Sequence, residues 1–365
     1  MDIQAKINKK IKYLFNPPTL KTVGFLGFDI NSCPTSCLVQ HGKHEFGLSK
    51  WVSPKRSRSY PYGRVYDTLG YSKRITVIPV YKEEGKAGDR DYLQWDTVSL
   101  MSLLDVFVVL AYYSKAEKHS TRENKITNQQ FDSEYVCKKL TEISEYQSSA
   151  LDWNMREVSE SLPTLVEKAK KSYGCISNKL DIELHGEDGI EKFQNKIASS
   201  VDAFMHSSRH KAKQAQQREF STLQPKEHLQ TDSKAKITIT DYLGGCYYFT
   251  TDEIEIKGNQ LLLIEAKHTK NTKLPSMADI KDGLLKMILY SNLENVTVKN
   301  HQYSPVPVLK LTSSIISGKI TSQSSRKEID CFIQQNQYQG KKKIDLEYIL
   351  QEGRNNNILI RIEGV

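Results

Sequence analysis

A tight turn between two strand-forming runs constrains the fold of this chain more than any other feature. Residues 250–256 and 261–267 are rich in β-favouring side chains, and Gly258-Asn259 lies between the two runs. Glycine followed by asparagine suits a two-residue β-hairpin turn. With this turn the flanking residues pair directly, so the register of the whole hairpin follows by counting back along both strands.

The register brings three charged side chains together at one end of the hairpin. It places Asp252 directly opposite Glu265, and directly opposed residues of antiparallel strands have Cβ atoms about 5 Å apart. Strand alternation puts Lys267 on the same face as Glu265. We expect a helix to cover the rest of that face, which is apolar. It consists of Ile254, Ile256, Leu261 and Leu263.

Two carboxylates and a lysine in this arrangement suit the hydrolysis of a phosphodiester. Asp252 and Glu265 can hold Mg²⁺, which keeps several of its own waters, and Mn²⁺ can replace it. The metal neutralises phosphate charge and lowers the pKa of a bound water. Lys267 can hold the attacking water or stabilise charge in the transition state. The alternative is an exposed hairpin whose charges form a weak surface ion pair.

At these residues the chain resembles the PD-(D/E)XK nuclease superfamily, and within it the type II restriction endonucleases. The family's first metal-binding acid falls on Asp252, with Thr251 at the position of the name-giving proline. Its second acid and its lysine fall on Glu265 and Lys267. The resemblance therefore assigns catalysis to these three side chains and metal binding to the two acids.

The resemblance extends over residues 182–295 and implies a further site residue and a fold. The stretch Gly189–Phe193 resembles the glycine-containing start of the helix that precedes the family's hairpin, so Glu191 is the candidate for a third catalytic and metal-binding acid. The expected order across 187–311 is helix, hairpin, helix, strand. It predicts an α/β fold with a mixed central sheet flanked by helices, a restriction-endonuclease-like core, preceded by an N-terminal α/β region.

The resemblance also implies an activity and partners. It predicts a Mg²⁺-dependent, sequence-specific endonuclease for double-stranded DNA, a type II restriction enzyme in the cytoplasm of a bacterium or archaeon. A symmetric DNA target suits a homodimer with one active site per strand. A companion DNA methyltransferase is implied by the family alone. The alternatives are a repair or junction-cleaving nuclease of the same fold and a non-catalytic DNA-binding regulator, which would not depend on Asp252 or Lys267.

Length and charge agree with a polyanionic partner. The 365 residues are enough for two domains, and 52 lysines and arginines against 43 acids give a net charge of +9. The six cysteines form no zinc-binding pattern and are expected to be reduced, and no apolar run approaches the length of a membrane span. We expect residues 1–135 to recognise DNA, 136–180 to form a helical connector, and 181–365 to form the catalytic domain.

A basic segment at residues 50–74 is the predicted DNA-binding surface. It holds seven lysines and arginines against one acid, Asp67, and five aromatic residues are interleaved with them. Arginines there could hold phosphates or read guanine edges. The alternative is a solvated loop whose tyrosines anchor it in the core. The predicted DNA contacts are Lys55, Arg56, Arg58, Tyr60, Arg64 and, beyond the hairpin, Lys270.

Two rival acidic sites are weaker. Residues 82–115 contain six acids, but no strand there ends in an acid-x-Lys pattern, so turns and ion pairs are the favoured interpretation. Asp241 precedes Gly244-Gly245 and could cap a turn, so it ranks behind Asp252 as the hairpin acid. The six acids are Glu83, Glu84, Asp89, Asp91, Asp96 and Asp105.

The remaining pattern gives a coarse set of elements. Residues 1–45 are expected to be mostly irregular and 116–135 to form a loop. One amphipathic helix is expected to start near Glu187 and continue through Phe204. A second is expected to run from an N-cap at Ser276 to Leu293.

Overall fold

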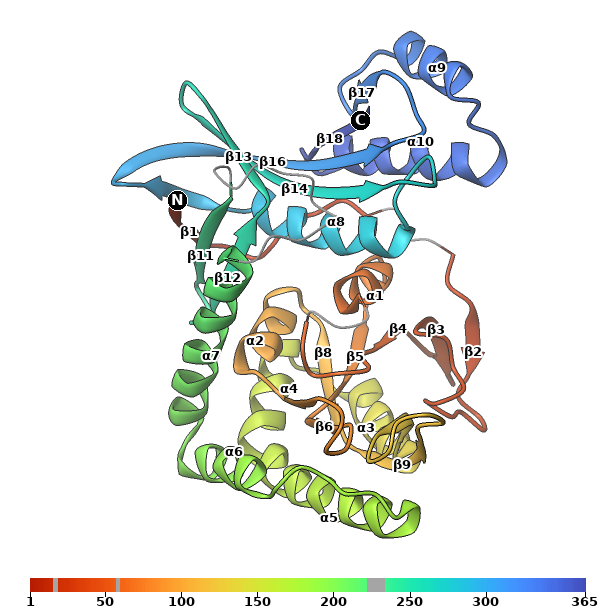
Figure 1. The fold of residues 1–365 in the computed structure, drawn as a ribbon, viewed down its shortest axis with the longest axis vertical. Helices are drawn as coiled ribbons and strands as arrows, with labels where there is room; N and C mark the ends of the chain where they lie inside the picture. The colour runs from red at the N-terminus through yellow and green to blue at the C-terminus, as the bar shows by residue number, and fades with distance from the viewer. Residues whose placement is uncertain (16–18, 57–59, 222–233) are drawn as a thin grey trace. The chain divides into compact units, whose positions relative to one another are not determined.

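The computed structural model describes residues 1–15, 19–56, 60–221 and 234–365. The fold is mixed α/β, with helices flanking sheets, as expected (Figure 1). The chain forms two compact units: unit one is Met1–Asn16 with Lys211–Val365, and unit two is Pro17–His210. These bounds differ from the three predicted ranges, because the N-terminal residues pack with the C-terminal part of the chain.

Unit one is built on a mixed sheet. Among the described residues it has nine strands, in the order β12-β11-β1-β15-β16-β14-β13, with β18 paired to β16 and β17 paired to β18. The strands are β1 (Asp2–Ile7), β11 (Ala235–Asp241), β12 (Cys246–Thr251), β13 (Glu253–Lys257), β14 (Gln260–Thr269), β15 (Glu294–Val298), β16 (His301–Ser313), β17 (Lys319–Thr321) and β18 (Leu359–Gly364). The helices are the C-terminal half of α7 (Val201–Ser221), α8 (Met277–Ser291), α9 (Arg326–Gln335) and α10 (Gly340–Asn355).

The first strand corrects the expectation that residues 1–45 are mostly irregular. β1 pairs with β11 in parallel, with Ile3 beside Ile237, and lies inside the sheet. Its alternating Ile3, Ala5 and Ile7 are buried, while the residues between them are exposed. Residues 25–29 form turns and irregular backbone, in agreement with that expectation.

The hairpin register is confirmed. Lys257 pairs with Gln260, and the antiparallel ladder runs back to Glu253 opposite Ile264. Gly258 has a φ of 58°, which glycine adopts without strain in a tight turn. On its other edge, β14 pairs in parallel with β16 over its full length, from Gln260 beside Ser304 onwards.

Helix α8 covers one face of β14 and β16, as Figure 1 shows. Its predicted N-cap is confirmed, because the Ser276 hydroxyl accepts a hydrogen bond from the Asp279 backbone N–H. Gly283 allows the helix to approach the sheet closely. A Cβ at that position would lie 2.8 Å from Leu309 Cδ1 and 3.7 Å from Lys267 Cε. The predicted cover is therefore present over Leu261 and Leu263, which are fully buried, whereas Ile256 near the turn remains exposed.

Unit two has its own parallel and antiparallel pairings. Its largest described sheet has five strands in the order β2-β3-β4-β5-β8, and β6–β7 and β9–β10 form two-stranded sheets. The strands are β2 (Thr22–Gly24), β3 (Ser36–His41), β4 (His44–Lys50), β5 (Arg74–Pro79), β6 (Tyr81–Glu83), β7 (Arg90–Tyr92), β8 (Phe107–Ala111), β9 (Tyr113–Lys118) and β10 (Ile126–Phe131). The helices are α1 (Pro61–Thr68), α2 (Trp95–Leu103), α3 (Ser133–Glu145), α4 (Ala150–Arg156), the π-helix η1 (Glu157–Ser161), α5 (Leu162–Leu180), α6 (Asp188–Ser199) and the first half of α7.

Two predicted elements of this region are corrected. Residues 116–135 are not one loop, since β9 and β10 pair through them. The helix expected from Glu187 through Phe204 is divided at Ser200, whose extended backbone separates α6 from α7. Phe193 and Phe204 are nevertheless both buried, so the two helices share the predicted apolar stripe. No helix in the described ranges is long and apolar enough to cross a bilayer.

Candidate functional site

Asp252 lies at the bend between β12 and β13, where the chain passes from one strand to the next. Its backbone N–H donates to the Ile264 carbonyl at 3.0 Å. Its Oδ2 accepts from the Ala266 backbone N–H at 2.8 Å. The carboxylate is thus held across β14, beside Glu265. Burial raises the pKa of Asp252 to about 7, and the charge of Glu265 adds to this rise.

Glu265 points to the same site from the centre of β14, and only 6% of it is exposed. Its Oε1 accepts from Lys267 Nζ at 3.0 Å, and its Oε2 accepts from Lys286 Nζ. Burial alone would raise the pKa of this carboxyl, but the two lysines outweigh it and hold the pKa at about 2. Glu265 is therefore a fixed anion between two cations. The structure brings together all three side chains that the hairpin register predicts.

Lys286 is a member of this cluster that the sequence analysis missed. It lies in the middle of α8 and also donates to the Thr250 carbonyl at 2.6 Å. Burial would lower its pKa, but Glu265 outweighs that effect and the pKa lies well above the ordinary value. Its signal in the sequence is a lysine inside the apolar run Leu284–Leu289. A charged residue so placed on a covered helix needs a buried partner.

Asp282 and Tyr290 lie on the same helix face as Lys286, at four-residue spacing. Burial raises the pKa of Asp282 to about 6, against the opposing charge of Lys267. Burial also raises the pKa of Tyr290, and the charges of Glu265 and Asp252 are near enough to contribute. Within the described ranges, the buried hydroxyls of Tyr290 and Thr251 have no hydrogen-bond partner. Asp282 and Tyr290 thus add polar groups near the predicted triad.

The third predicted acid, Glu191, lies on α6 in unit two, outside the unit that carries the hairpin. It is exposed and forms an ion pair with Lys170, with 3.7 Å between Nζ and Oε1. Within unit one, α7 supplies a different acid near the hairpin. Glu219 accepts a hydrogen bond from the Thr250 hydroxyl at 2.6 Å, two residues before Asp252.

The donors at the hairpin suit a hard divalent cation held by few protein ligands. No group of three or more His, Cys, Asp or Glu side chains in the described part of the chain is arranged to hold a metal ion. Asp252 and Glu265 remain as two neighbouring carboxylates, and each carboxylate oxygen can accept more than one contact. Mg²⁺ is commonly bound by one or two carboxylates together with waters and substrate phosphates. The residues present therefore fit Mg²⁺, with Asp252 and Glu265 as the groups that would hold it.

A cavity of about 670 Å³ opens at the C-terminal end of β14, directly after Lys267. Lys270, a predicted DNA contact, lines it together with Lys342 of α10. His268 also lines it, and its Nδ1 lies 2.9 Å from the Thr312 hydroxyl of the neighbouring strand β16. One ring nitrogen of His268 therefore contacts the sheet itself. The lining also includes Asp279 and Asp345, and it begins one residue after Lys267, so the cavity lies beyond the end of the acidic cluster and does not enclose it.

Several cations of the basic segment at residues 50–74 hold the backbone of unit two. Lys50 donates to the carbonyls of Ile30 and Cys33 at 2.6 and 2.7 Å. Arg64 donates to the Lys50 carbonyl at 2.7 Å, and burial lowers the pKa of its guanidinium. Lys73 donates to the Tyr146 carbonyl at 3.0 Å. These side chains are committed to the fold of unit two. The core-anchor interpretation holds for Trp51, Tyr62 and Tyr66, which are buried.

The other predicted contacts of that segment are more accessible. Tyr60 is 42% exposed and precedes α1 in a left-handed conformation, and Arg56 is half-buried. Lys55 is ion-paired with the buried Asp91, with 2.5 Å between Nζ and Oδ1. Arg58 lies outside the described residues.

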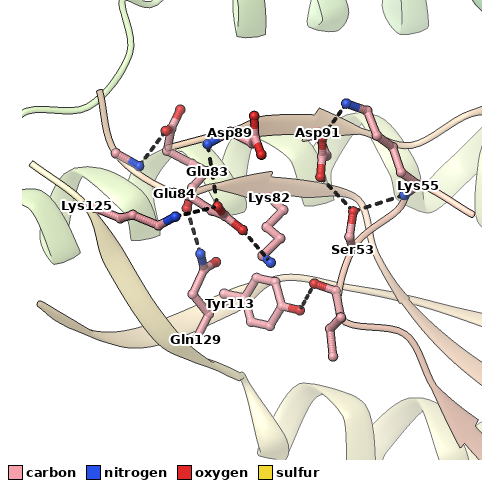
Figure 2. A network of polar contacts seen from close by, with 12 residues as sticks. Ser53, Lys55, Lys82, Glu83, Glu84, Asp89, Asp91, Tyr113, Lys125 and Gln129 are labelled. Carbon is pink, nitrogen blue, oxygen red and sulfur yellow. Dashed lines mark hydrogen bonds and ion pairs between the residues drawn. The ribbon is translucent and has the colours of Figure 1, made fainter. Parts of the chain in front are cut away.

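Figure 2 shows four of the rival acids of residues 82–115, Glu83, Glu84, Asp89 and Asp91, within a network of polar contacts. Glu83 accepts from the Tyr81 hydroxyl and the Gly85 backbone N–H, both at 2.8 Å, and from His185 Nδ1 at 2.6 Å. Glu84 forms an ion pair with Lys82 at 2.8 Å. These contacts tie the β6–β7 loop to its surroundings.

Three more of the rival acids are also paired. Asp91 accepts from the Ser53 hydroxyl at 2.8 Å in addition to its contact with Lys55. Asp96 lies 3.9 Å from Arg209 Nε, and Asp105 lies 3.0 Å from Arg74 Nη2. The arrangement agrees with the turn and ion-pair interpretation of this segment.

Asp241 serves the β11–β12 turn. Its Oδ1 accepts from the backbone N–H groups of Leu243 and Gly245, at 2.8 and 2.7 Å, and its Oδ2 accepts from the Tyr247 hydroxyl at 2.6 Å. It lies at the far end of β11 from Ala235, the residue that pairs with Thr251 next to Asp252. The structure therefore separates this acid from the hairpin cluster.

Comparison with known proteins adds no relative: no family profile, curated protein or solved structure matches the chain.

Proposed function

We propose that this chain is a Mg²⁺-dependent endonuclease that hydrolyses phosphodiester bonds of double-stranded DNA, most similar in type to a type II restriction enzyme. The observation that carries the proposal is the position of half-buried Asp252 beside buried Glu265, with Lys267 on one oxygen of Glu265. Two neighbouring acids, one buried and the other half-buried with a pKa of about 7, are the kind of perturbed cluster that gathers at functional sites.

The order of elements supports the same proposal. In unit one, α7 is followed by β11, β12, β13, β14, α8, β15 and β16, and β14 and β16 are parallel neighbours. This is the order of helix, hairpin, helix and strand that the PD-(D/E)XK resemblance implies. A restriction-endonuclease-like core is therefore part of the proposal, with Thr251 at the proline position.

The side chains have distinct tasks in this proposal. Asp252 and Glu265 would hold the cation, which when bound would neutralise phosphate charge and lower the pKa of a bound water. The Lys267 side chain is 22% exposed, against 8% for Glu265 and 11% for Lys286. Lys267 is therefore the lysine placed to stabilise charge on a phosphate or hold the attacking water. Burial strengthens these interactions because water competes less with them.

The net charge of +9 supports DNA as the partner, and Lys270 and Lys342 at the cavity are suited to phosphates. A homodimer would present two such sites to a symmetric duplex. The companion methyltransferase stays an implication of the family, with no residue of this chain assigned to it.

The test is cleavage of plasmid DNA by the full chain in the presence of Mg²⁺, followed by sequencing of the ends. We expect discrete fragments with fixed ends, loss of cleavage in a chelator, and partial or full activity with Mn²⁺. Asp252→Asn should bind the same DNA without cutting it. Fixed ends would support a restriction enzyme. Cleavage only of branched DNA would indicate a junction nuclease, and binding without cleavage by the wild-type chain would indicate a regulator.

A further inference from the structure

Lys286 is a second cation at a carboxylate that already has one. Lys267 contacts Glu265 Oε1 at 3.0 Å, while Lys286 contacts the other oxygen, Oε2. The two lysines approach from different elements, β14 and α8. Both oxygens of the proposed metal ligand are therefore engaged by ammonium groups of the chain itself.

Lys286 is the more deeply placed of the two lysines. Its side chain is 11% exposed, against 22% for Lys267, and it also holds the Thr250 carbonyl at 2.6 Å. An apolar residue would suit its place in the run Leu284–Leu289 and would avoid burying a charge. Its contacts instead join the end of β12 to β14 across the site.

The charge of Lys286 opposes a cation at the same carboxylate. A divalent ion bound by Glu265 would lie within a few ångströms of the Lys286 ammonium, where like charges repel strongly in a buried site. Loss of a residue that only orients a metal ligand weakens metal binding, by 10- to 100-fold in typical cases. Loss of a competing cation has the opposite effect, so the direction of change separates the two roles.

We propose that Lys286 is a built-in counter-cation that acts through Glu265, holding its carboxylate in place and keeping the affinity of the site for divalent metal low. This inference rests on the proposed function, because it takes Asp252 and Glu265 as the metal-binding groups. Lys286 is thus a positioning residue whose charge sets the metal affinity. DNA phosphates bring negative charge to the site and offset this repulsion, so metal binds more readily with DNA than without it.

The experiment measures Mn²⁺ binding to the full chain without DNA, for example by calorimetry, at about pH 8, where carboxylates are ionised. Lys286→Met should bind Mn²⁺ at least tenfold more tightly than the wild-type chain. The matched control is Lys310→Met, since Lys310 also pairs with a glutamate, Glu253, at 2.9 Å, but on the other face of the sheet. Its Mn²⁺ affinity should stay within about twofold of the wild type.

Unchanged or weaker Mn²⁺ binding in Lys286→Met would overturn the counter-cation role. If that variant does not fold, Lys286→Gln decides by the same criterion, because it removes the charge and keeps a donor for Glu265. A failure of the proposed function would give a different result, because the wild-type chain and Asp252→Asn would then bind Mn²⁺ equally. If only the inference about Lys286 fails, Asp252→Asn still binds Mn²⁺ more weakly than the wild-type chain.

Discussion

Glutamates of the β13–β14 hairpin meet basic side chains on both faces of the sheet. On the α8 face, Glu265 contacts Lys267 and Lys286, and Asp252 lies beside it. On the opposite face, Glu253 pairs with Lys310 at 2.9 Å, and Glu255 pairs with Arg361 at 2.9 Å. The residue types and many of the distances are similar, so the contacts alone do not distinguish the two faces.

The pKa of Asp252 distinguishes them, since Glu265 and Glu255 both have a pKa lowered to about 2. On the opposite face a hydrogen bond from Arg361 lowers the pKa of Glu255 to about 2, as expected for an acid that gains a partner in the fold. On the α8 face the pKa of Asp252 rises to about 7, because the group is buried and Glu265 is already ionised beside it. The ion pairs of the opposite face stabilise the fold, whereas on the α8 face the ionised form of Asp252 is destabilised by its surroundings. Unfavourable burial of a second acid is the stronger indication of a site retained for chemistry.

The largest expected difference between the faces is in cleavage. Glu265→Gln should lower the rate of DNA cleavage by about 10³-fold or more, since it removes a metal-binding charge worth several kcal/mol in the transition state. Glu253→Gln, the same change on the opposite face, should stay within about threefold. Single-turnover cleavage at saturating Mg²⁺ measures both. Similar losses in the two variants would mean that stability, and not chemistry, explains the effect.

The second difference is in the sign of pH-dependent stability. Folded Asp252 keeps its proton up to about pH 7, whereas the unfolded chain releases it near 3.8, so this group makes the fold less stable as pH rises between these values. Asp252→Asn mimics the protonated form. In chelator it should match the wild-type chain near pH 4 and exceed its unfolding free energy by roughly 4 kcal/mol above pH 7.

Glu255→Gln should show the opposite sign in the same urea titrations. The lowered pKa of Glu255 contributes stability above about pH 4.5, and this contribution is lost as pH falls towards 2. The variant should be less stable than the wild type at pH 7 and equal to it near pH 2. The loss should be modest, because the side chain is partly exposed and solvent screens the pair. Two variants that shift stability in the same direction would break the comparison.

A third test compares Asp252 of the hairpin with Asp241 of the β11–β12 turn. Asp241→Ala leaves the backbone N–H groups of Leu243 and Gly245 without their acceptor, so we expect a loss of about 1–3 kcal/mol in unfolding free energy. Its cleavage rate, measured under conditions where it is folded, should remain near the wild-type value. An inactive but stably folded Asp241→Ala would move the catalytic acid away from the hairpin.

The hairpin was predictable because its constraints are local. A two-residue turn fixes the register, so the positions of Asp252, Glu265 and Lys267 follow from counting alone. Lys286 was missed because a lysine in a helical pattern is ordinarily assigned to solvent, and its burial depends on a strand about 20 residues away in the chain. The position of Lys286 inside the apolar run Leu284–Leu289 is the feature of the sequence that indicates its burial.

The features that could not be predicted from the sequence depend on contacts between residues far apart in the chain. β1 belongs to the central sheet only because it meets β11, more than 200 residues later. The third acid was sought on a helix taken as continuous, but the break at Ser200 leaves Glu191 on α6 in unit two. Glu219 of α7 is the acid that contacts the β12 strand before the hairpin.

The smallest expected effect concerns DNA binding by one lysine near each face of the hairpin. Lys270 is exposed and follows β14 at the cavity, whereas Lys257 is exposed near the hairpin turn and pairs with Glu255 at 2.9 Å on the opposite face. If Lys270 meets one phosphate, Lys270→Ala should reduce the slope of log affinity against log salt by about 0.9. Lys257→Ala should leave the slope unchanged, since its charge is neutralised within the chain. Fluorescence anisotropy of a labelled duplex across a salt series, in chelator, measures both slopes. Equal slopes for the two variants would show that DNA does not approach the hairpin from the side of the cavity, and would limit the α8 face to binding the cation.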